Sequence, residues 1–174
     1  DRIGAAIATR LAAEDYAVVI HYRSSGEKAQ DLADAIAADG GRAEIVQADL
    51  AKRQDRMGLI AKAAEPFGPL TVLVNNASVF ELSPDYFSYT LSKSLLWTAT
   101  RTLAQSLAPR IRVNAIGPGP TLANARQSQS EFEASRRRLP LQTGADPDEI
   151  ADGVFSILTL PSMTGQMIAL DGGE

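Results

Sequence analysis

A tyrosine and a lysine four residues apart carry the clearest chemistry in the sequence. Tyr89 and Lys93 are the first and last residues of YTLSK, so on a helix they share one face about one turn apart. A phenol with a pKa of about 10 is a poor acid at neutral pH, but a nearby ammonium favours the phenolate and lowers that pKa. Such a phenol can exchange a proton with an alkoxide or an imine nitrogen. Because the pair also arises by chance as a surface contact, its meaning depends on its context.

A second polar group follows the β-branched run at 16–22. Arg23, Ser24 and Ser25 come directly after this run, with no carboxylate before Glu27. At such a strand end a ribose 2′-hydroxyl usually meets an acidic residue, whereas a 2′-phosphate meets a basic one. One cation and two hydroxyl donors therefore predict recognition of a 2′-phosphate, and hence NADPH rather than NADH. The alternative is a polar turn with a serine helix cap.

Two further residues lie at expected element ends. Gly4 stands at the start of a helical pattern, where a pyrophosphate would meet free N–H groups and the positive end of the helix dipole. A glycine there also serves close packing. His21, the one histidine of the chain, has no second ligand beside it, and we expect it to be packed or hydrogen-bonded rather than catalytic.

The segments that must position these residues alternate between strand and helix patterns. Strands are expected at 16–22, 43–50, 70–75, 110–116 and 167–170, and helices at 2–15, 27–38, 54–64, after Tyr89 and from 146 onward. Gly40 and Gly41 should end the second helix. In the long helix the residues expected to be buried are Leu91, Leu95, Leu96, Ala99, Leu103 and Leu107. The alternation predicts a parallel sheet covered on both faces, with ligands beyond the carboxyl ends of its strands.

Composition excludes several classes of protein. The 174 residues carry a net charge of -4, which argues against a nucleic-acid binder. With no cysteine and one histidine, thiol chemistry, disulfides and a His or Cys metal cluster are excluded, and no metal is expected. No segment approaches the run of about 18 apolar residues that a membrane helix needs. The expectation is one domain over 1–174, in a cytoplasmic enzyme.

Six motifs, taken in order, resemble the short-chain dehydrogenase/reductase family. They are RIG, QADL, VLVNNAS, YTLSK, RIRVNAIGPG and TGQMIALDGG, and together they span nearly the whole chain. The resemblance implies a Rossmann-type doubly wound sheet and a homotetramer or homodimer. It implies Tyr89 as proton donor, and Lys93 as its electrostatic partner and a ligand of the nicotinamide ribose. The further cofactor contacts that it implies are Asp49 and Leu50 at the adenine, Asn75, Asn76, Ala77 and Ser78 along the cofactor, and Pro118, Gly119, Pro120 and Thr121 at the nicotinamide.

A narrower resemblance concerns the substrate. The chain has Arg2-Ile3-Gly4 where most family members have Gly-Ile-Gly, and together with HYRSS and NNASVF this is similar to pteridine reductases and bacterial dihydromonapterin or dihydrofolate reductases. In that group the arginine lies by the pyrophosphate and substrate, and an aromatic residue matching Phe80 stacks on the pterin. The alternatives are that Phe80 packs under a loop, and that the enzyme is a 3-oxoacyl-thioester or generic carbonyl reductase.

Some parts of the family pattern are missing from the sequence. No strand or glycine-rich loop precedes Arg2, and no serine or aspartate stands on a strand of its own before Tyr89. One hypothesis is that the sequence is only part of an enzyme of roughly 250 residues. Two stretches that are separate in the full enzyme would then be joined between Phe80 and Tyr86. The other is a short NADP-binding scaffold without turnover. The first is favoured, because without the central strand its two neighbours would be left with an unpaired hydrogen-bonding edge.

Overall fold

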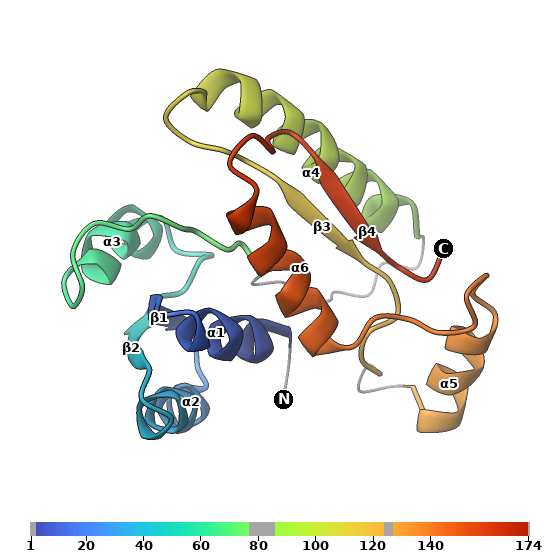
Figure 1. Cartoon of the computed structure of the whole chain (residues 1–174), viewed down its shortest axis with the longest axis horizontal. Helices are drawn as coiled ribbons and strands as arrows, with labels where there is room; N and C mark the ends of the chain where they lie inside the picture. Colours follow the sequence, from blue (N-terminus) through green and yellow to red (C-terminus); the bar gives the residue numbers. More distant parts are fainter. Residues whose placement is uncertain (1–2, 77–85, 124–126, 174) are drawn as a thin grey trace. The chain divides into compact units, whose positions relative to one another are not determined.

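The computed structural model describes residues 3–76, 86–123 and 127–173, with the backbone alone for 86–93. The chain forms two compact units, Ile3–Ala77 and Ser78–Glu174, and each is described by itself (Figure 1). Both units combine helices with parallel strands, as the sequence predicts for an α/β protein. The prediction of a single domain over 1–174 stays a prediction.

The first unit has a parallel strand pair with helices packed on it. Its elements are α1 (Ile3–Ala13), β1 (Ala17–Tyr22), α2 (Gly26–Ala38), β2 (Arg42–Gln47) and α3 (Arg53–Ala64). The strands pair from Ala17 with Arg42 to Tyr22 with Gln47. Ala8, Ala12 and Ile36, from the facing sides of α1 and α2, form a small core against the strands. Because the strands are parallel, Tyr22 and Gln47 end at the same edge of the sheet.

The end of α2 confirms the predicted glycine stop. Gly40 adopts a φ of 87°, a left-handed conformation that glycine reaches without the steric cost of a Cβ atom. The amide of Gly41 then donates to the carbonyl of Ile36 at 2.9 Å. This closes the helix and turns the chain into β2.

The strand predicted at 70–75 is wrong, because the structure assigns no strand to this described segment. Leu73 is 64% exposed, although its sequence context is that of a buried strand. A strand persists only when its backbone groups find neighbours. Among the described residues the paired strands are β1 with β2 and β3 with β4, and none of them pairs with this segment.

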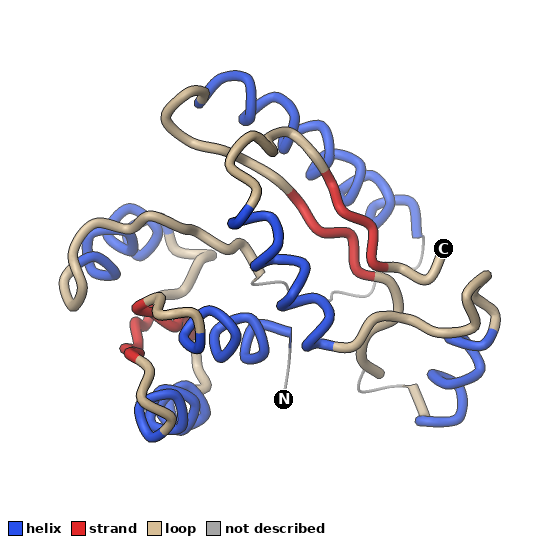
Figure 2. Tube along the Cα trace, in the orientation of Figure 1, coloured by secondary structure: helices blue, strands red, loops and turns tan. Residues whose placement is uncertain are grey.

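The second unit pairs two short strands under a helix. Its elements are α4 (Tyr86–Leu107), β3 (Ala115–Pro118), α5 (Gln129–Arg137), α6 (Pro147–Thr159) and β4 (Met167–Leu170). Strands β3 and β4 are parallel and lie side by side in Figure 2. Helix α6 contacts both strands. It begins where the sequence predicts, after an Asp146 cap that accepts the amide of Glu149 at 2.8 Å.

Two sequence expectations for this unit are corrected. The strand expected at 110–116 begins only at Ala115, because the preceding residues bond to a turn: Val113 N–H donates to the Thr164 hydroxyl and Gly165 N–H to the Val113 carbonyl. In α4, Thr100 and Ala104 are buried instead of the expected leucines. The four expected residues that are exposed are Leu95, Leu96, Ala99 and Leu103.

Arg112 ties the end of α6 to the approach to β3. Its guanidinium donates at 2.8–3.3 Å to the carbonyls of Ile157, Leu158, Leu160 and Met163. The last carbonyls of a helix have no partner within the helix, and a cation there also meets the negative end of the dipole. One side chain therefore satisfies the C-terminus of α6.

The segment after β3 is packed against the C-terminal tail. A Cβ at Gly119 would lie 2.7 Å from the Cα of Asp171 and 2.8 Å from its carbonyl oxygen. A Cβ at Gly144 would lie 2.8 Å from the Pro120 carbonyl oxygen. The Thr121 hydroxyl is buried and donates to the Gly119 carbonyl at 3.1 Å. Backbone therefore confines the segment 118–121 from two sides.

Replacing Arg112 with methionine should destabilise the protein by about 2–4 kcal/mol, because several half-buried carbonyls lose a charged donor at once. The melting temperature should fall by roughly 5–15 °C in thermal unfolding monitored by circular dichroism. The matched control is Arg110→Met, at an exposed arginine two residues earlier, which should change stability by less than about 0.5 kcal/mol. Equal melting temperatures for the two variants would contradict the role given to Arg112.

Gly119→Ala should cost about 2 kcal/mol or more, because the added methyl meets backbone atoms that cannot rotate away. Gly117→Ala is the control, since its Cβ would lie 3.4 Å from the flexible Met167 sulfur. That variant should remain close to the wild type in urea denaturation. The packing assigned to Gly119 would be refuted by equal denaturation midpoints.

Candidate functional site

The start of α1 lies against the end of the segment that precedes residue 77. A Cβ at Gly4 would come within 2.6 Å of the Asn76 side-chain nitrogen, so the structure brings together two predicted cofactor residues far apart in the sequence. Only a residue without a side chain leaves this approach open. Gly4 is also the second residue of α1, at the helix end where an anion such as a pyrophosphate is favoured.

The turn between β1 and α2 presents a cation and two hydroxyl groups to solvent. Arg23, Ser24 and Ser25 are all exposed. Ser25 is the N-cap residue of α2, yet its side chain makes no capping hydrogen bond, contrary to the alternative that it serves as a serine cap. A pocket of about 390 Å³ lies over this turn, lined by Ser24, Ser25, Gly26, Glu27 and Lys28. Its hydroxyls and helix-end amides are donors that fit a phosphate.

Sequence reasoning missed Lys28, which lines this pocket from the first turn of α2. A cation near a helix N-terminus is disfavoured by the helix dipole. That local conflict is the signal that could have identified the residue, because departures from helix rules are expected where a ligand supplies the compensating charge.

The turn after β2 holds the predicted adenine contacts. The Asp49 amide donates to the Asp55 carboxylate at 2.8 Å, and the Asp49 carboxylate accepts the Ala51 amide at 3.0 Å. Leu50 is exposed, and its carbonyl accepts from Arg56. The turn is therefore internally braced, with an apolar side chain facing outward. His21 is hydrogen-bonded to the Ala48 carbonyl, as expected from the sequence.

The predicted proton-transfer pair belongs to the second unit. Tyr89 and Lys93 both belong to α4, with the i and i+4 spacing that the sequence predicts. Their side chains lie outside the described part of the structure, as do the predicted site residues Arg2, Ala77, Ser78 and Phe80. Pro118, Gly119, Pro120 and Thr121 leave the carboxyl end of β3, the edge at which parallel sheets bind ligands.

Helix α5 is capped at its start by its own neighbouring side chains. It begins with a capping box in which the Ser128 hydroxyl accepts the Glu131 amide at 3.3 Å and the Glu131 carboxylate accepts the Ser128 amide at 2.8 Å. The hydrogen bonds from the Ser128 backbone and hydroxyl lower the pKa of Glu131. The start of α5 is therefore defined by local bonds.

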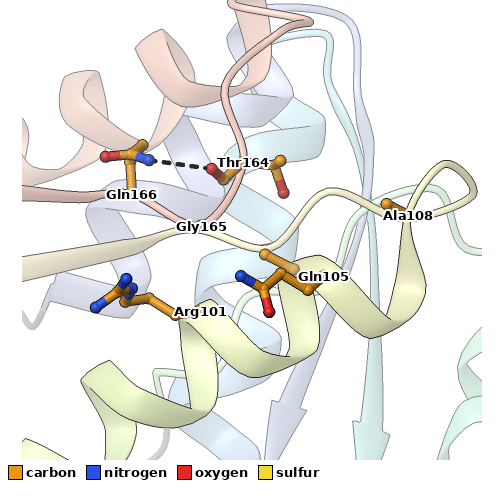
Figure 3. Close-up of a pocket in the computed structure, with 7 residues that line it drawn as sticks. Arg101, Gln105, Ala108, Thr164, Gly165 and Gln166 are labelled. Atoms are coloured by element: carbon orange, nitrogen blue, oxygen red, sulfur yellow. Dashed lines mark hydrogen bonds between the residues drawn. The ribbon is translucent and has the colours of Figure 1, made fainter.

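A second pocket lies at the opposite end of the strands of its unit. It has a volume of about 350 Å³ and lies between the C-terminal half of α4 and the residues that precede β4, with Arg101, Gln105 and Gln166 at its rim (Figure 3). Because cofactors of such sheets bind beyond the carboxyl ends, this pocket is not assigned to the dinucleotide.

Among the residues that the structure describes, no group of acidic and histidine side chains could hold a metal ion. Within the same ranges, no helix has the length and apolar character needed to cross a membrane.

Comparison with known proteins places the chain in a family. Residues 1–87 match the family described as short chain dehydrogenase, and residues 78–174 match the family described as enoyl-(acyl carrier protein) reductase. The two matches meet at 78–87, around the predicted join. An uncharacterized oxidoreductase of Methylorubrum extorquens is 32% identical over 230 residues, covering 98% of this chain and 92% of its own. That span exceeds the 174 residues of this chain, so the relative carries residues within it that this chain lacks.

A solved structure and a second relative add detail. The crystal structure of FolM alternative dihydrofolate reductase 1 from Brucella suis, in complex with NADP, is 40% identical with a TM-score of 0.93, over 99% of this chain and 90% of its own. The 3-oxoacyl-[acyl-carrier-protein] reductase of Synechocystis is 27% identical, over 98% of this chain and 92% of its own. The chain belongs to the short-chain dehydrogenase/reductase family of oxidoreductases, whose Rossmann-type α/β fold it shares.

Proposed function

We propose that this protein is an NADPH-dependent reductase that acts on a C=O or C=N group of a small molecule. The observation that carries the proposal is the turn between β1 and α2, where the Ser25 hydroxyl makes no capping hydrogen bond and lines a pocket with Ser24 and Lys28. The exposed Arg23 precedes these serines in the same turn. Two cations, two hydroxyls and the first amides of a helix match the charge and acceptor oxygens of a 2′-phosphate. NADP in the Brucella suis structure supports this choice of cofactor.

Each unit offers further residues for the dinucleotide. Gly4 and Asn76 suit the pyrophosphate, because the Asn76 amide group lies against the start of α1, and a helix N-terminus favours an anion. Asp49 and Leu50 would border the adenine from the braced turn after β2. Pro118, Gly119, Pro120 and Thr121, held rigidly by their backbone contacts, would border the nicotinamide.

Tyr89 and Lys93 supply the proton chemistry in this proposal. NADPH, when bound, supplies the hydride that reduces the carbon. The electron pair of the reduced double bond moves onto the oxygen or nitrogen, and the Tyr89 hydroxyl protonates that atom, directly or through a water that it orients. Lys93, one helical turn away, stabilises the phenolate left behind and would also bind the nicotinamide ribose.

For the substrate, we propose a pterin or dihydrofolate-type compound. The support is the likeness to the Brucella suis alternative dihydrofolate reductase, together with Arg2 and the aromatic Phe80, whose ring would stack on a flat heterocycle. The alternative is a 3-oxoacyl thioester or simple ketone, which the Synechocystis relative favours at lower identity. A non-catalytic NADP-binding scaffold is the alternative of another class.

We also propose that the protein works in the cytoplasm as a homotetramer or homodimer. The leucines at 95, 96 and 103 are exposed along α4, and an apolar helix surface of this kind supports a subunit contact.

Tyr89→Phe should lower kcat by a factor of about 100 or more, because the proton donor is removed. The dissociation constant for NADPH should stay within about twofold, since the phenol adds little to cofactor binding. The control is Tyr86→Phe, on the same helix three residues earlier, which should retain activity. Turnover by Tyr89→Phe at the wild-type rate would remove Tyr89 from the mechanism.

The substrate class is tested by following NADPH oxidation with dihydrobiopterin, dihydrofolate, an acetoacetyl thioester and simple ketones. The expected result is turnover of the reduced pterins, with NADPH preferred to NADH by at least tenfold in kcat/KM because of the phosphate-binding turn. Turnover of the thioester alone would favour the acyl-reductase alternative. NADPH binding without oxidation by any of the substrates would favour the scaffold.

A further inference from the structure

His21 connects the ends of the two strands in the first unit. It lies one residue before the end of β1, is half-buried, and its Nε2 is 2.9 Å from the carbonyl oxygen of Ala48. A carbonyl oxygen only accepts hydrogen bonds, so the imidazole proton resides on Nε2 and the ring donates it. The tautomer of His21 is therefore determined by its partner.

The carbonyl of Ala48 is satisfied by this hydrogen bond. Ala48 is 2% exposed, and it is the first residue after the last register pair of the strands, Tyr22 with Gln47. Its amide donates to the Tyr22 carbonyl at 3.1 Å, while its own carbonyl has left the ladder and receives the His21 ring. Without that donor a buried carbonyl would be left unsatisfied, which a protein rarely tolerates.

A further hydrogen bond joins the same two segments, and here the donor comes from β2. The Gln47 side-chain amide donates to the carbonyl of Arg23 at 3.1 Å. Three hydrogen bonds thus join residues 21–23 to residues 47–48 just where the strands end. On one side begins the turn with Arg23, Ser24 and Ser25, and on the other the turn with Asp49 and Leu50.

We propose that His21 is a positioning residue that holds these two turns in register, so that they bind the adenosine end of a dinucleotide as one rigid surface. The inference rests on the proposed function, because it assigns a purpose to a contact beside the proposed cofactor site. His21 acts through the Ala48 carbonyl. When Ala48 is held in place, the direction of the backbone at Asp49 is fixed as well. The hydrogen bonds from the Asp49 amide to the Asp55 carboxylate and from the Ala51 amide to the Asp49 carboxylate then constrain the rest of the turn.

The proposal predicts a specific pattern of cofactor affinity. Loss of the hydrogen bond between His21 and the Ala48 carbonyl should weaken the binding of NADPH and NADH alike, because the adenine-side turn serves both cofactors. Loss of the Arg23 side chain, by contrast, should weaken only the binding of NADPH, because only NADPH carries the 2′-phosphate. The maximal rate should not change, since His21 contacts no reacting group.

The test compares His21→Leu with His21→Gln. Glutamine places an amide nitrogen donor at nearly the reach of the imidazole Nε2, whereas leucine has similar bulk and no donor. Fluorescence titration should give dissociation constants for NADPH and NADH that rise about tenfold in His21→Leu and return to within about threefold of wild type in His21→Gln, with kcat within about twofold throughout. Arg23→Leu is the comparison that should affect NADPH alone.

Hydrogen exchange of the Ala48 and Asp49 amides provides a readout independent of turnover. Both amides should exchange faster in His21→Leu and return toward wild type in His21→Gln. A wild-type protein that binds neither cofactor would overturn the proposed function and this inference with it. A wild type that binds NADPH, with His21→Leu binding equally well or His21→Gln as impaired as His21→Leu, would overturn the inference alone.

Discussion

The parallel pairing of neighbouring strands is the constraint on which the rest of the structure depends. Parallel strands end at a common edge, so the segments that follow β1 and β2 emerge side by side, as do those that follow β3 and β4. Three of these segments carry predicted site residues: Arg23 to Ser25, Asp49 and Leu50, and Pro118 to Thr121. The fold brings polar groups together at strand ends without any of them having to stabilise it.

Bonds that lie just beyond the strands then make these segments rigid. His21 and Gln47 join the two turns of the first unit, and Gly119 allows the tail to pack directly on the segment after β3. Arg112 serves the opposite end of its unit, where it satisfies the C-terminus of α6. Preorganised binding segments lose less conformational entropy when they meet a ligand, which suits a site that must hold a long, flexible dinucleotide.

Much of this arrangement could be predicted, and the exceptions have physical causes. Alternating patterns, the Gly40 stop and the helix start at residue 146 depend on residues close in sequence, and the structure confirms them. The strand at 70–75 was not correctly predicted, because a strand requires partners and none of the described strands pairs with this segment. The burial pattern of α4 was also wrong, since an apolar stripe indicates a preference for burial but not the surface that provides it.

The sequence by itself determined most of the helices and strands, the family, and the spacing of Tyr89 and Lys93, because all of these reside in local patterns and motifs. Only the tertiary structure decided which polar groups at the strand ends form hydrogen bonds within the protein. The Ser25 hydroxyl makes no cap, Lys28 joins the pocket beside it, and the His21 ring is engaged by a carbonyl from the neighbouring strand. Such facts depend on which backbone groups remain unpaired once the strands have come together, and a linear sequence does not contain that information.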